Sequence, residues 1–286
     1  MSRTPAFRAA VALLLLCAMR AGAPAAEPPR RIASLSLTAD EILVEIVPLE
    51  RLVAATTAAD DPEMSNVVGR VPPSIARFPK ADVERLLALA PELVVVSEYT
   101  DADFLHLLER TRLRTHRMTG LHSLVGMRQA ILDLGQAVGE PEAARRLVAR
   151  FDGRLSDLAG RLAGAPRPRA LYWSSPFTAG GDSAIGALIE CGGAVNVGRE
   201  LGLTGIQPLD AERAFMSQPD VIVVGLQDDI AVLRGHPLLS KLPAVRAGRL
   251  VYIPSRLLVT LSQHAADACW AIASALHPRR TPRGAP

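Results

Sequence analysis

One amphipathic segment between two similar stretches of sequence constrains the fold of this chain more than any other feature. The segment runs from Ser123 to Gly139 and reads SLVGMRQAILDLGQAVG. Ser123 suits an N-cap, Gly139 suits the position after a helix end, and the apolar residues between them recur at steps of three and four, at Leu124, Met127, Ile131, Leu134 and Val138. Such a helix is about 25 Å long, which is enough to connect two small domains.

The stretches on either side of this helix resemble each other. Residues 83–97 read VERLLALAPELVVVS and residues 211–225 read AERAFMSQPDVIVVG. Each has a glutamate at its second position, a proline seven residues later, then an acidic residue and a β-branched run. The shared register favours a duplicated helix–turn–strand unit over chance similarity. The sequence therefore predicts two lobes of similar topology joined by one helix.

Strand and helix patterns alternate through the rest of the chain, which is typical of a parallel sheet covered by helices on both faces. We therefore expect an α/β protein with two Rossmann-like lobes, each with a central, mainly parallel sheet, joined by a single long α-helix. The expected boundaries are a signal peptide at 1–25, a linker at 26–30, an N-terminal α/β lobe at 31–120, the connecting helix at 121–140, a C-terminal α/β lobe at 141–278 and a disordered tail at 279–286.

Two local patterns near the N-terminus lead to narrower expectations. Thr38 and Glu41 have the spacing of a capping box, in which two side chains bond backbone N–H groups at a helix start. Residues 66–78 contain Gly69, Pro72 and Pro73 and show no period, so we expect them to form a loop.

The first 25 residues have the composition of a cleaved secretory signal peptide. Arg3 and Arg8 precede a short apolar run at 9–19, and residues 23–25 (APA) fit a small-x-small cleavage site. The run is too short to anchor the chain in a bilayer. Removing this segment takes three arginines and no acid from a chain with 32 basic and 29 acidic residues, so the exported protein is about neutral. Nucleic acid is therefore not an expected partner.

Signatures of catalysis and of metal binding are scarce. The segment Gly180–Gly186 lacks both the lysine of a phosphate-binding loop and the glycine spacing of a dinucleotide fold, so we interpret it as a ligand-facing loop. The six histidines show no pairing at i, i+4, and only His264 is expected near a cleft. We expect no catalytic residue, no metal site and no cofactor.

Two cysteines, Cys191 and Cys269, remain after removal of the signal peptide. An even number in an oxidising compartment permits a disulfide, and two buried free thiols are the alternative.

Glu84 and Glu212 occupy the first turn of a predicted helix in each half of the chain. The helix dipole favours a negative charge there, and this effect alone explains one such residue. Because both halves place a glutamate in the same register, we favour docking of the pair to a partner with two basic sites.

Three of these features together point to a known family: the stretch RIASLSLTADEIL at 31–43, the duplicated E-x6-P-[ED] pattern and the mid-chain helix. They resemble the substrate-binding proteins of ABC importers, in the class with two lobes and one rigid connecting helix, over roughly Arg31 to Pro278. The stretch PFTAGGDSAIGALIECGG at 176–193 is most similar to the vitamin B12-binding members. In those members the cysteine before Gly-Gly is bridged to one on the last helix, which implies a bridge between Cys191 and Cys269.

The resemblance also implies roles for individual residues. In that family the paired glutamates meet arginines of the two permease subunits, and these correspond to Glu84 and Glu212. Aromatic residues of both lobes enclose the ligand, although two of their positions hold Ser97 and Ile206 in this chain. The implied ligand-binding residues are Phe78, Tyr99, Trp173, Phe177 and Arg256.

The resemblance, together with the lack of catalytic motifs, implies a monomeric periplasmic carrier and not an enzyme. It would capture a bulky metal chelate between its lobes, with vitamin B12 (cobalamin) as the leading ligand, and deliver it to an inner-membrane ABC permease. A ferric siderophore or haem is the alternative ligand within the class. A secreted two-domain enzyme would need an acid–base constellation, and a chaperone for a bare metal ion would need clustered ligands; we find neither pattern in the sequence.

Overall fold

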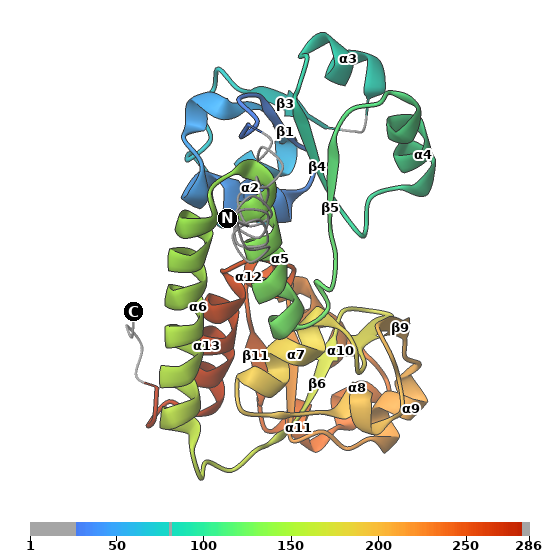
Figure 1. The fold of residues 1–286 in the computed structure, drawn as a ribbon. Coiled ribbons are helices and arrows are strands. Elements are labelled where there is room, and N and C mark those ends of the chain that lie inside the picture. The colour runs from blue at the N-terminus through green and yellow to red at the C-terminus, as the bar shows by residue number, and fades with distance from the viewer. Residues whose placement is uncertain (1–26, 80–81, 282–286) are drawn as a thin grey trace, which may run out of the picture.

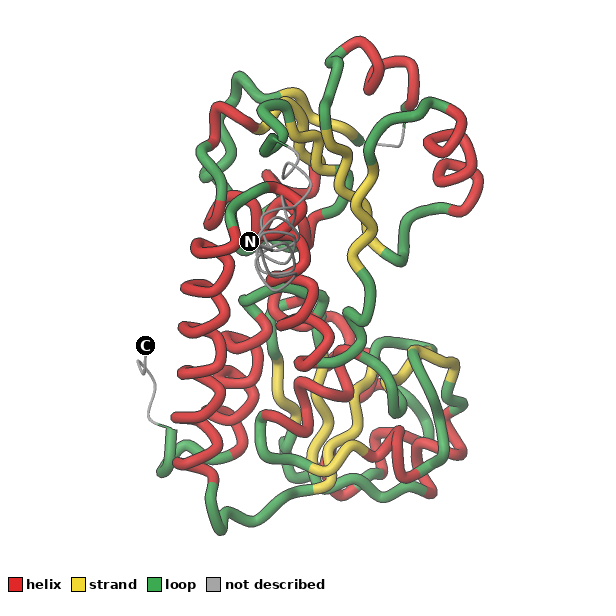
Figure 2. The backbone as a smooth tube through the Cα atoms, in the orientation of Figure 1, coloured by secondary structure: helices red, strands yellow, loops and turns green. Residues whose placement is uncertain are grey.

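The computed structural model describes residues 27–79 and 82–281. The expected signal peptide at 1–25 therefore lies outside the described residues, as do residues 282–286 of the expected tail. The described chain forms two α/β lobes, each with a central parallel sheet and flanking helices (Figure 1, Figure 2), which confirms the predicted fold class. None of its helices is both long and apolar enough to cross a membrane.

The N-terminal lobe is built on a five-stranded parallel sheet in the order β3-β2-β1-β4-β5. Its strands are β1 (Ile32–Ser34), β2 (Leu52–Thr56), β3 (Ala76–Phe78), β4 (Leu93–Ser97) and β5 (Thr115–Met118). Its helices are α2 (Leu37–Ile46), α3 (Val83–Ala88) and α4 (Ala102–Arg110), with 3-10 turns at Leu49–Arg51 and Thr57–Asp60.

The C-terminal lobe has a four-stranded parallel sheet in the order β11-β10-β6-β8, together with an antiparallel pair formed by β7 and β9. Its strands are β6 (Arg169–Trp173), β7 (Phe177–Ala179), β8 (Val195–Asn196), β9 (Ile206–Pro208), β10 (Val221–Val224) and β11 (Leu250–Tyr252). Its helices are α7 (Ala184–Cys191), α8 (Val197–Glu200), α9 (Ala211–Met216), α10 (Gln227–Gly235), α11 (Pro243–Arg246), α12 (Ser255–Leu258) and α13 (Ala265–Leu276), with a 3-10 turn at Leu239–Lys241.

Two adjacent helices connect the lobes. The helix expected at 121–140 is α5 (Leu124–Val138), and α6 (Pro141–Leu162) packs along it and beside both lobes (Figure 1). Leu147 and Val148 of α6 belong to the N-terminal core, whereas Phe151 and Leu158 of the same helix belong to the C-terminal core. With 22 residues, α6 is about 33 Å long. The connection is therefore a helix pair in which α6 makes the longer span.

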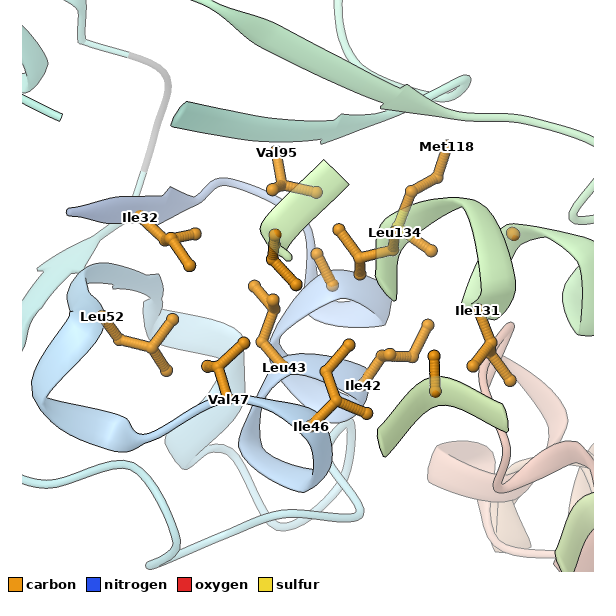
Figure 3. Packing of buried hydrophobic residues seen from close by; sticks show 14 of the residues in the cluster. Ile32, Ile42, Leu43, Ile46, Val47, Leu52, Val95, Met118, Ile131 and Leu134 are labelled. Carbon is orange, nitrogen blue, oxygen red and sulfur yellow. The ribbon is translucent and has the colours of Figure 1, made fainter. Parts of the chain in front are cut away.

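The strands bury side chains on both faces because successive residues point to opposite sides of a sheet. On one face Ile32 and Val95 pack with the apolar side chains of α2 and α5 (Figure 3). On the other face Ala33, Val94 and Val96 pack with α3 and α4. A strand that is covered on both faces must be apolar at every position.

The two duplicated sequence units adopt the same local structure. Asp82 and Asp210 cap α3 and α9, each accepting a hydrogen bond from the backbone N–H three residues on, at 3.0 and 2.7 Å. Ala90 and Gln218 hold equivalent positions in front of the prolines, and both have a φ of 43°. Left-handed φ angles are uncommon outside glycine, so their recurrence at matching positions supports a duplication.

Two expectations near the N-terminus are wrong. Residues 66–78 are not loop throughout, because Ala76–Phe78 pairs with β2 as the edge strand β3. Thr38 and Glu41 do not form a capping box, because α2 begins after Ser36 and has no side-chain cap hydrogen bond. The Glu41 carboxylate instead accepts a hydrogen bond from Thr260, which lies 219 residues further along the chain.

Cys191 at the end of α7 and Cys269 within α13 form a disulfide, with their Cα atoms 5.4 Å apart. The bridge joins two helices that pack on the same face of the C-terminal sheet. It spans 78 residues of sequence, and by the chain-entropy argument a loop of that size contributes about 4.5 kcal/mol of stability.

The chain remains packed against the rest of the protein at residues 279–281, although we expected a disordered tail from residue 279 onward. Thr281 is fully buried, and the Arg280 guanidinium donates a hydrogen bond of 2.6 Å to the carbonyl oxygen of Ala163. The described part of the expected tail, residues 279–281, is thus attached to the end of α6.

The side chain of Asp40 places a carboxyl group in the interior of the N-terminal lobe. Its Oδ2 atom accepts hydrogen bonds from the backbone N–H and the hydroxyl of Thr56, at 3.0 and 2.5 Å. Burial raises the pKa of Asp40 to about 7, while hydrogen bonds from Ser34 and Thr56 oppose the rise and the nearby Glu41 adds to it. In the folded protein Asp40 therefore keeps its proton at pH values where the unfolded chain has lost it.

Because the pKa of Asp40 is higher in the folded than in the unfolded protein, the free energy of unfolding should fall as the pH rises from about 4 to about 7. A shift of about three pKa units corresponds to roughly 4 kcal/mol. Asp40→Asn should remove most of this decline, because an amide does not ionise. Urea unfolding at pH 5 and pH 8 measures the difference. Asp103→Asn, an exposed control, should keep the wild-type dependence, and the same dependence in Asp40→Asn would contradict the assignment.

Candidate functional site

A cleft with a volume of about 740 Å³ lies between the two lobes. The N-terminal lobe lines it from the ends of β4 and β5 and the segment before α5, with Glu98, Tyr99, Arg117 and His122. The C-terminal lobe lines it from the start of α7, from β9 and from the segment after α12, with residues 182–185, Gly205, Ile206, Leu258, Val259 and Leu261. In the N-terminal lobe these are the carboxyl ends of parallel strands, where ligands bind in α/β sheets.

The walls of the cleft expose large apolar side chains from both lobes. Tyr99 is 62% exposed on the N-terminal side, and Ile206 and Val259 are 52% and 39% exposed on the C-terminal side. Apolar side chains that gather in a concave surface mark a binding site more strongly than scattered ones do. The arrangement suits a bulky ligand with two apolar faces.

A tight turn after β4 positions Tyr99. The backbone N–H of Tyr99 donates to the Ser97 hydroxyl at 3.3 Å, and the Ser97 N–H donates to the Thr100 hydroxyl at 3.1 Å. Partial burial, with a smaller contribution from Glu98, raises the pKa of Tyr99. The phenol therefore stays protonated at neutral pH and can donate a hydrogen bond to a ligand.

Arg117 gives the N-terminal wall a positive charge. Its guanidinium donates a hydrogen bond of 3.2 Å to the carbonyl oxygen of Glu98 and forms no ion pair with any residue in the described ranges. The Glu98 carboxylate is itself occupied, because it accepts from the backbone N–H groups of Gly120 and Leu121 at 3.2 and 2.7 Å. The Arg117 charge is therefore available to an anionic group of a ligand.

The loop before α7 forms part of the C-terminal wall, in agreement with the expectation that Gly180–Gly186 faces the cleft. A Cβ atom on Gly180 would lie 2.3 Å from the carbonyl oxygen of Leu203, so only glycine fits there. The Ser183 hydroxyl donates to the Gly180 carbonyl at 2.7 Å and caps α7 through the Gly186 N–H at 3.1 Å. Asp182, between them, has a φ of 52°. The loop is therefore held in one conformation.

The structure places the five predicted ligand-binding residues in different parts of the molecule. Tyr99 lines the cleft. Phe78 and Trp173 are buried in the cores of the N-terminal and C-terminal lobes. Phe177 is exposed on β7, outside the residues that line the cleft. The Arg256 guanidinium donates to the Asn66 side-chain oxygen at 3.0 Å, across the lobe boundary.

Phe78 nevertheless lies near the ligand-facing edge of the N-terminal sheet. It borders a smaller hollow of about 270 Å³ with residues that follow β2 and β4, including Thr57 and Thr100. The Arg85 guanidinium carbon stacks 4.7 Å from the centre of its ring.

The paired glutamates are exposed on α3 and α9, one on each lobe. Neither Glu84 nor Glu212 forms an ion pair with a residue that the structure describes. Figure 1 shows both helices on the side of the molecule away from α6. Both carboxylates are therefore accessible to a partner that contacts the two lobes together.

The expectation that His264 lies near the cleft is wrong. His264 lines a separate hollow of about 300 Å³ beside α6 and contacts Asp267 at 2.9 Å. Within residues 27–79 and 82–281, no three His, Cys, Asp or Glu side chains gather in a way that could hold a metal ion.

Several residues of the cleft were not singled out from the sequence. Arg117 and His122 lie in a strand and a turn with no motif, and Val259 lies in a loop. A usable signal was that Arg117 lies near the end of a strand and His122 shortly before a helix, because side chains at the carboxyl ends of parallel strands converge on a binding site.

Comparisons with known proteins agree with this architecture. Residues 32–257 match the sequence model of the periplasmic binding protein family. The cobalamin-binding protein of Halobacterium salinarum is 25% identical over 208 residues, which are 70% of this chain and 55% of that protein. The chain thus spans little more than half the length of this curated relative.

Solved structures share the fold at lower identity. The periplasmic haem-binding protein of Roseiflexus sp. RS-1 is 24% identical with a TM-score of 0.71, covering 86% of this chain and 98% of that one. The periplasmic vitamin B12-binding protein of Vibrio cholerae is 21% identical with a TM-score of 0.71, covering 90% and 99%. Because the family match extends over most of the chain, this protein belongs to the periplasmic binding protein family, whose members bind solutes and are not enzymes.

Proposed function

We propose that this protein is the solute-binding component of an ABC importer, which captures a bulky metal chelate between its lobes and delivers it to a permease. The observation that carries the proposal is the cleft with apolar walls from two lobes, Tyr99 on one side and Ile206 and Val259 on the other. A large ring system with polar groups at its edge fits such walls. The protein itself only binds and releases the ligand, and the ATPase of the importer supplies the energy for transport.

The helix pair that joins the lobes supports a carrier with limited opening. Both α5 and α6 contribute side chains to the two cores, so a wide hinge motion would expose apolar surface at one end. One chain carries the whole cleft and both exposed glutamates, which is why we propose that it acts as a monomer. We also propose that the expected signal peptide directs the protein to the periplasm.

Cobalamin is the ligand that we place first. The stretch 176–193, which resembles vitamin B12-binding proteins, contributes residues 182–185 to the cleft. The cobalamin-binding relatives of Halobacterium salinarum support the same choice.

Titration of the purified protein with cyanocobalamin should change the visible absorbance of the corrin, and Tyr99→Ala should weaken this binding roughly tenfold because an apolar wall is lost. Val125→Ala is the control, since Val125 is 78% exposed but lies outside the cleft, and it should bind as the wild type does. No absorbance change with the wild-type protein would reject cobalamin.

The free charge of Arg117 favours a second candidate ligand, an anionic chelate such as haem, which carries two carboxylates, or a ferric siderophore. The guanidinium forms no ion pair among the described side chains, and a carboxylate is the group that it binds best.

Arg117→Gln should weaken haem binding roughly tenfold, because a charged hydrogen bond to a propionate is lost. The same change should leave the affinity for cyanocobalamin, whose side chains are mostly amides, nearly unchanged. Arg110→Gln, on the exposed face of α4, is the matched control. Equal losses for both chelates would contradict recognition of a carboxylate by Arg117.

Glu84 and Glu212 are the proposed docking residues for the permease. The double variant Glu84→Ala/Glu212→Ala should reduce ligand uptake by cells or by permease vesicles roughly tenfold, since rim charges control association with a complementary surface. Ligand affinity should not change. The exposed pair Glu109→Ala/Glu142→Ala should support normal uptake. Normal uptake with the first double variant would refute the docking role.

A further inference from the structure

A buried carboxylate of the N-terminal lobe holds the segment of the C-terminal lobe that forms one wall of the cleft. Glu41 on α2 is only 1% exposed. Its Oε2 atom accepts hydrogen bonds from the hydroxyls of Thr260 and Ser262, at 2.9 and 2.5 Å. Its backbone carbonyl accepts from the side-chain amide of Gln263 at 2.8 Å. All three donors belong to the other lobe.

Asn66, in the N-terminal lobe, adds further hydrogen bonds to this contact between the lobes, which we call the Glu41 junction. The Oε1 atom of Glu41 accepts from the backbone N–H and the side-chain amide of Asn66, at 3.0 and 2.8 Å. The Asn66 side chain also donates to the carbonyl oxygen of Arg256 at 2.9 Å and accepts from the Arg256 guanidinium at 3.0 Å. Each carboxylate oxygen of Glu41 thus has two donors, which satisfies an acceptor that has been removed from water.

The segment after α12 alternates between this junction and the cleft. Val259 and Leu261 line the cleft, whereas Thr260 and Ser262 bond Glu41. A shift of this segment by one residue would turn hydroxyls into the apolar wall and leave the buried carboxylate without its donors. The hydrogen bonds to Glu41 therefore determine where Val259 and Leu261 lie in the cleft wall.

We propose that Glu41 is a positioning residue for ligand binding, which fixes the wall formed by Val259 and Leu261 opposite Tyr99 and so sets the width of the cleft. The identity of the ligand rests on the proposed function, but the junction itself does not. An apolar contact between lobes tolerates small slides, whereas a set of hydrogen bonds to one carboxylate holds a single arrangement. A chelate that matches this arrangement dissociates slowly because the walls do not separate easily.

The first test uses hydrogen–deuterium exchange of the protein without ligand. In Glu41→Ala the backbone amides of residues 259–263 should exchange at least roughly tenfold faster than in the wild type, because their anchor is gone. Glu45→Ala is the matched control. Glu45 lies on the same helix and binds Arg70 and Arg150 at 2.5 and 3.1 Å, and among the described residues its carboxylate forms no hydrogen bond with residues 259–263. Wild-type exchange in Glu41→Ala, or equal changes in both variants, would overturn the proposal.

The second test measures dissociation of cyanocobalamin, or of haemin if the wild type binds that chelate instead. Glu41→Ala should release the ligand roughly tenfold faster. Glu41→Gln should recover a rate within about threefold of the wild type, because its amide can donate to Thr260 and Ser262, whose hydroxyls accept as well as donate. A purely structural loss would instead lower stability in both variants without this recovery of the rate.

If Glu41→Ala does not fold, two milder variants replace it in both tests. Thr260→Val and Ser262→Ala each remove one hydroxyl and leave the carboxylate its bonds to Asn66. Each should speed both exchange at 259–263 and ligand release, and unchanged values in both variants would refute the role of the junction. If the wild type binds none of the chelates, the proposed function fails, while the exchange data still decide whether Glu41 positions the wall.

Discussion

The packing of α6 against both hydrophobic cores is the constraint on which the rest of the structure depends. Leu147 and Val148 are buried in the N-terminal lobe, and Phe151 and Leu158, on the same face of the helix, are buried in the C-terminal lobe. A continuous helix cannot rotate one end independently without breaking backbone hydrogen bonds or exposing its apolar stripe. The two sheets are therefore held at a defined separation, and the cleft between them follows from this separation.

A buried acidic residue that bonds the other lobe makes the relative position of the two lobes specific. Asp40 and Glu41 are neighbours in sequence and both are buried, but their surroundings differ. Asp40 bonds Thr56 of its own lobe, and burial raises its pKa to about 7. Glu41 faces the other lobe and accepts from Thr260 and Ser262. The first residue is part of one core, whereas the second links the cores and orients a wall of the cleft.

Much of the scaffold was predictable because it follows from local physical chemistry. The period of residues 124–138 predicted α5, and the repeats at 83–97 and 211–225 became α3–β4 and α9–β10 with the same caps. The strand at Ala76–Phe78 was missed because it is short and is defined by its pairing with β2. The capping-box interpretation of Glu41 failed for a related reason, since its partners are distant in sequence.

The sequence alone determined the α/β class, the two lobes, the buried runs of the sheets and the pair of cysteines available for a bridge. Only the tertiary structure decided that Tyr99 faces Ile206 and Val259, that Phe78 and Trp173 are buried in cores, and that α6 spans both lobes. Helix and strand patterns depend on neighbours within a few residues, so they can be read locally. A cleft is formed by side chains far apart in the chain that meet only when whole lobes pack, and no local pattern records which of them will meet.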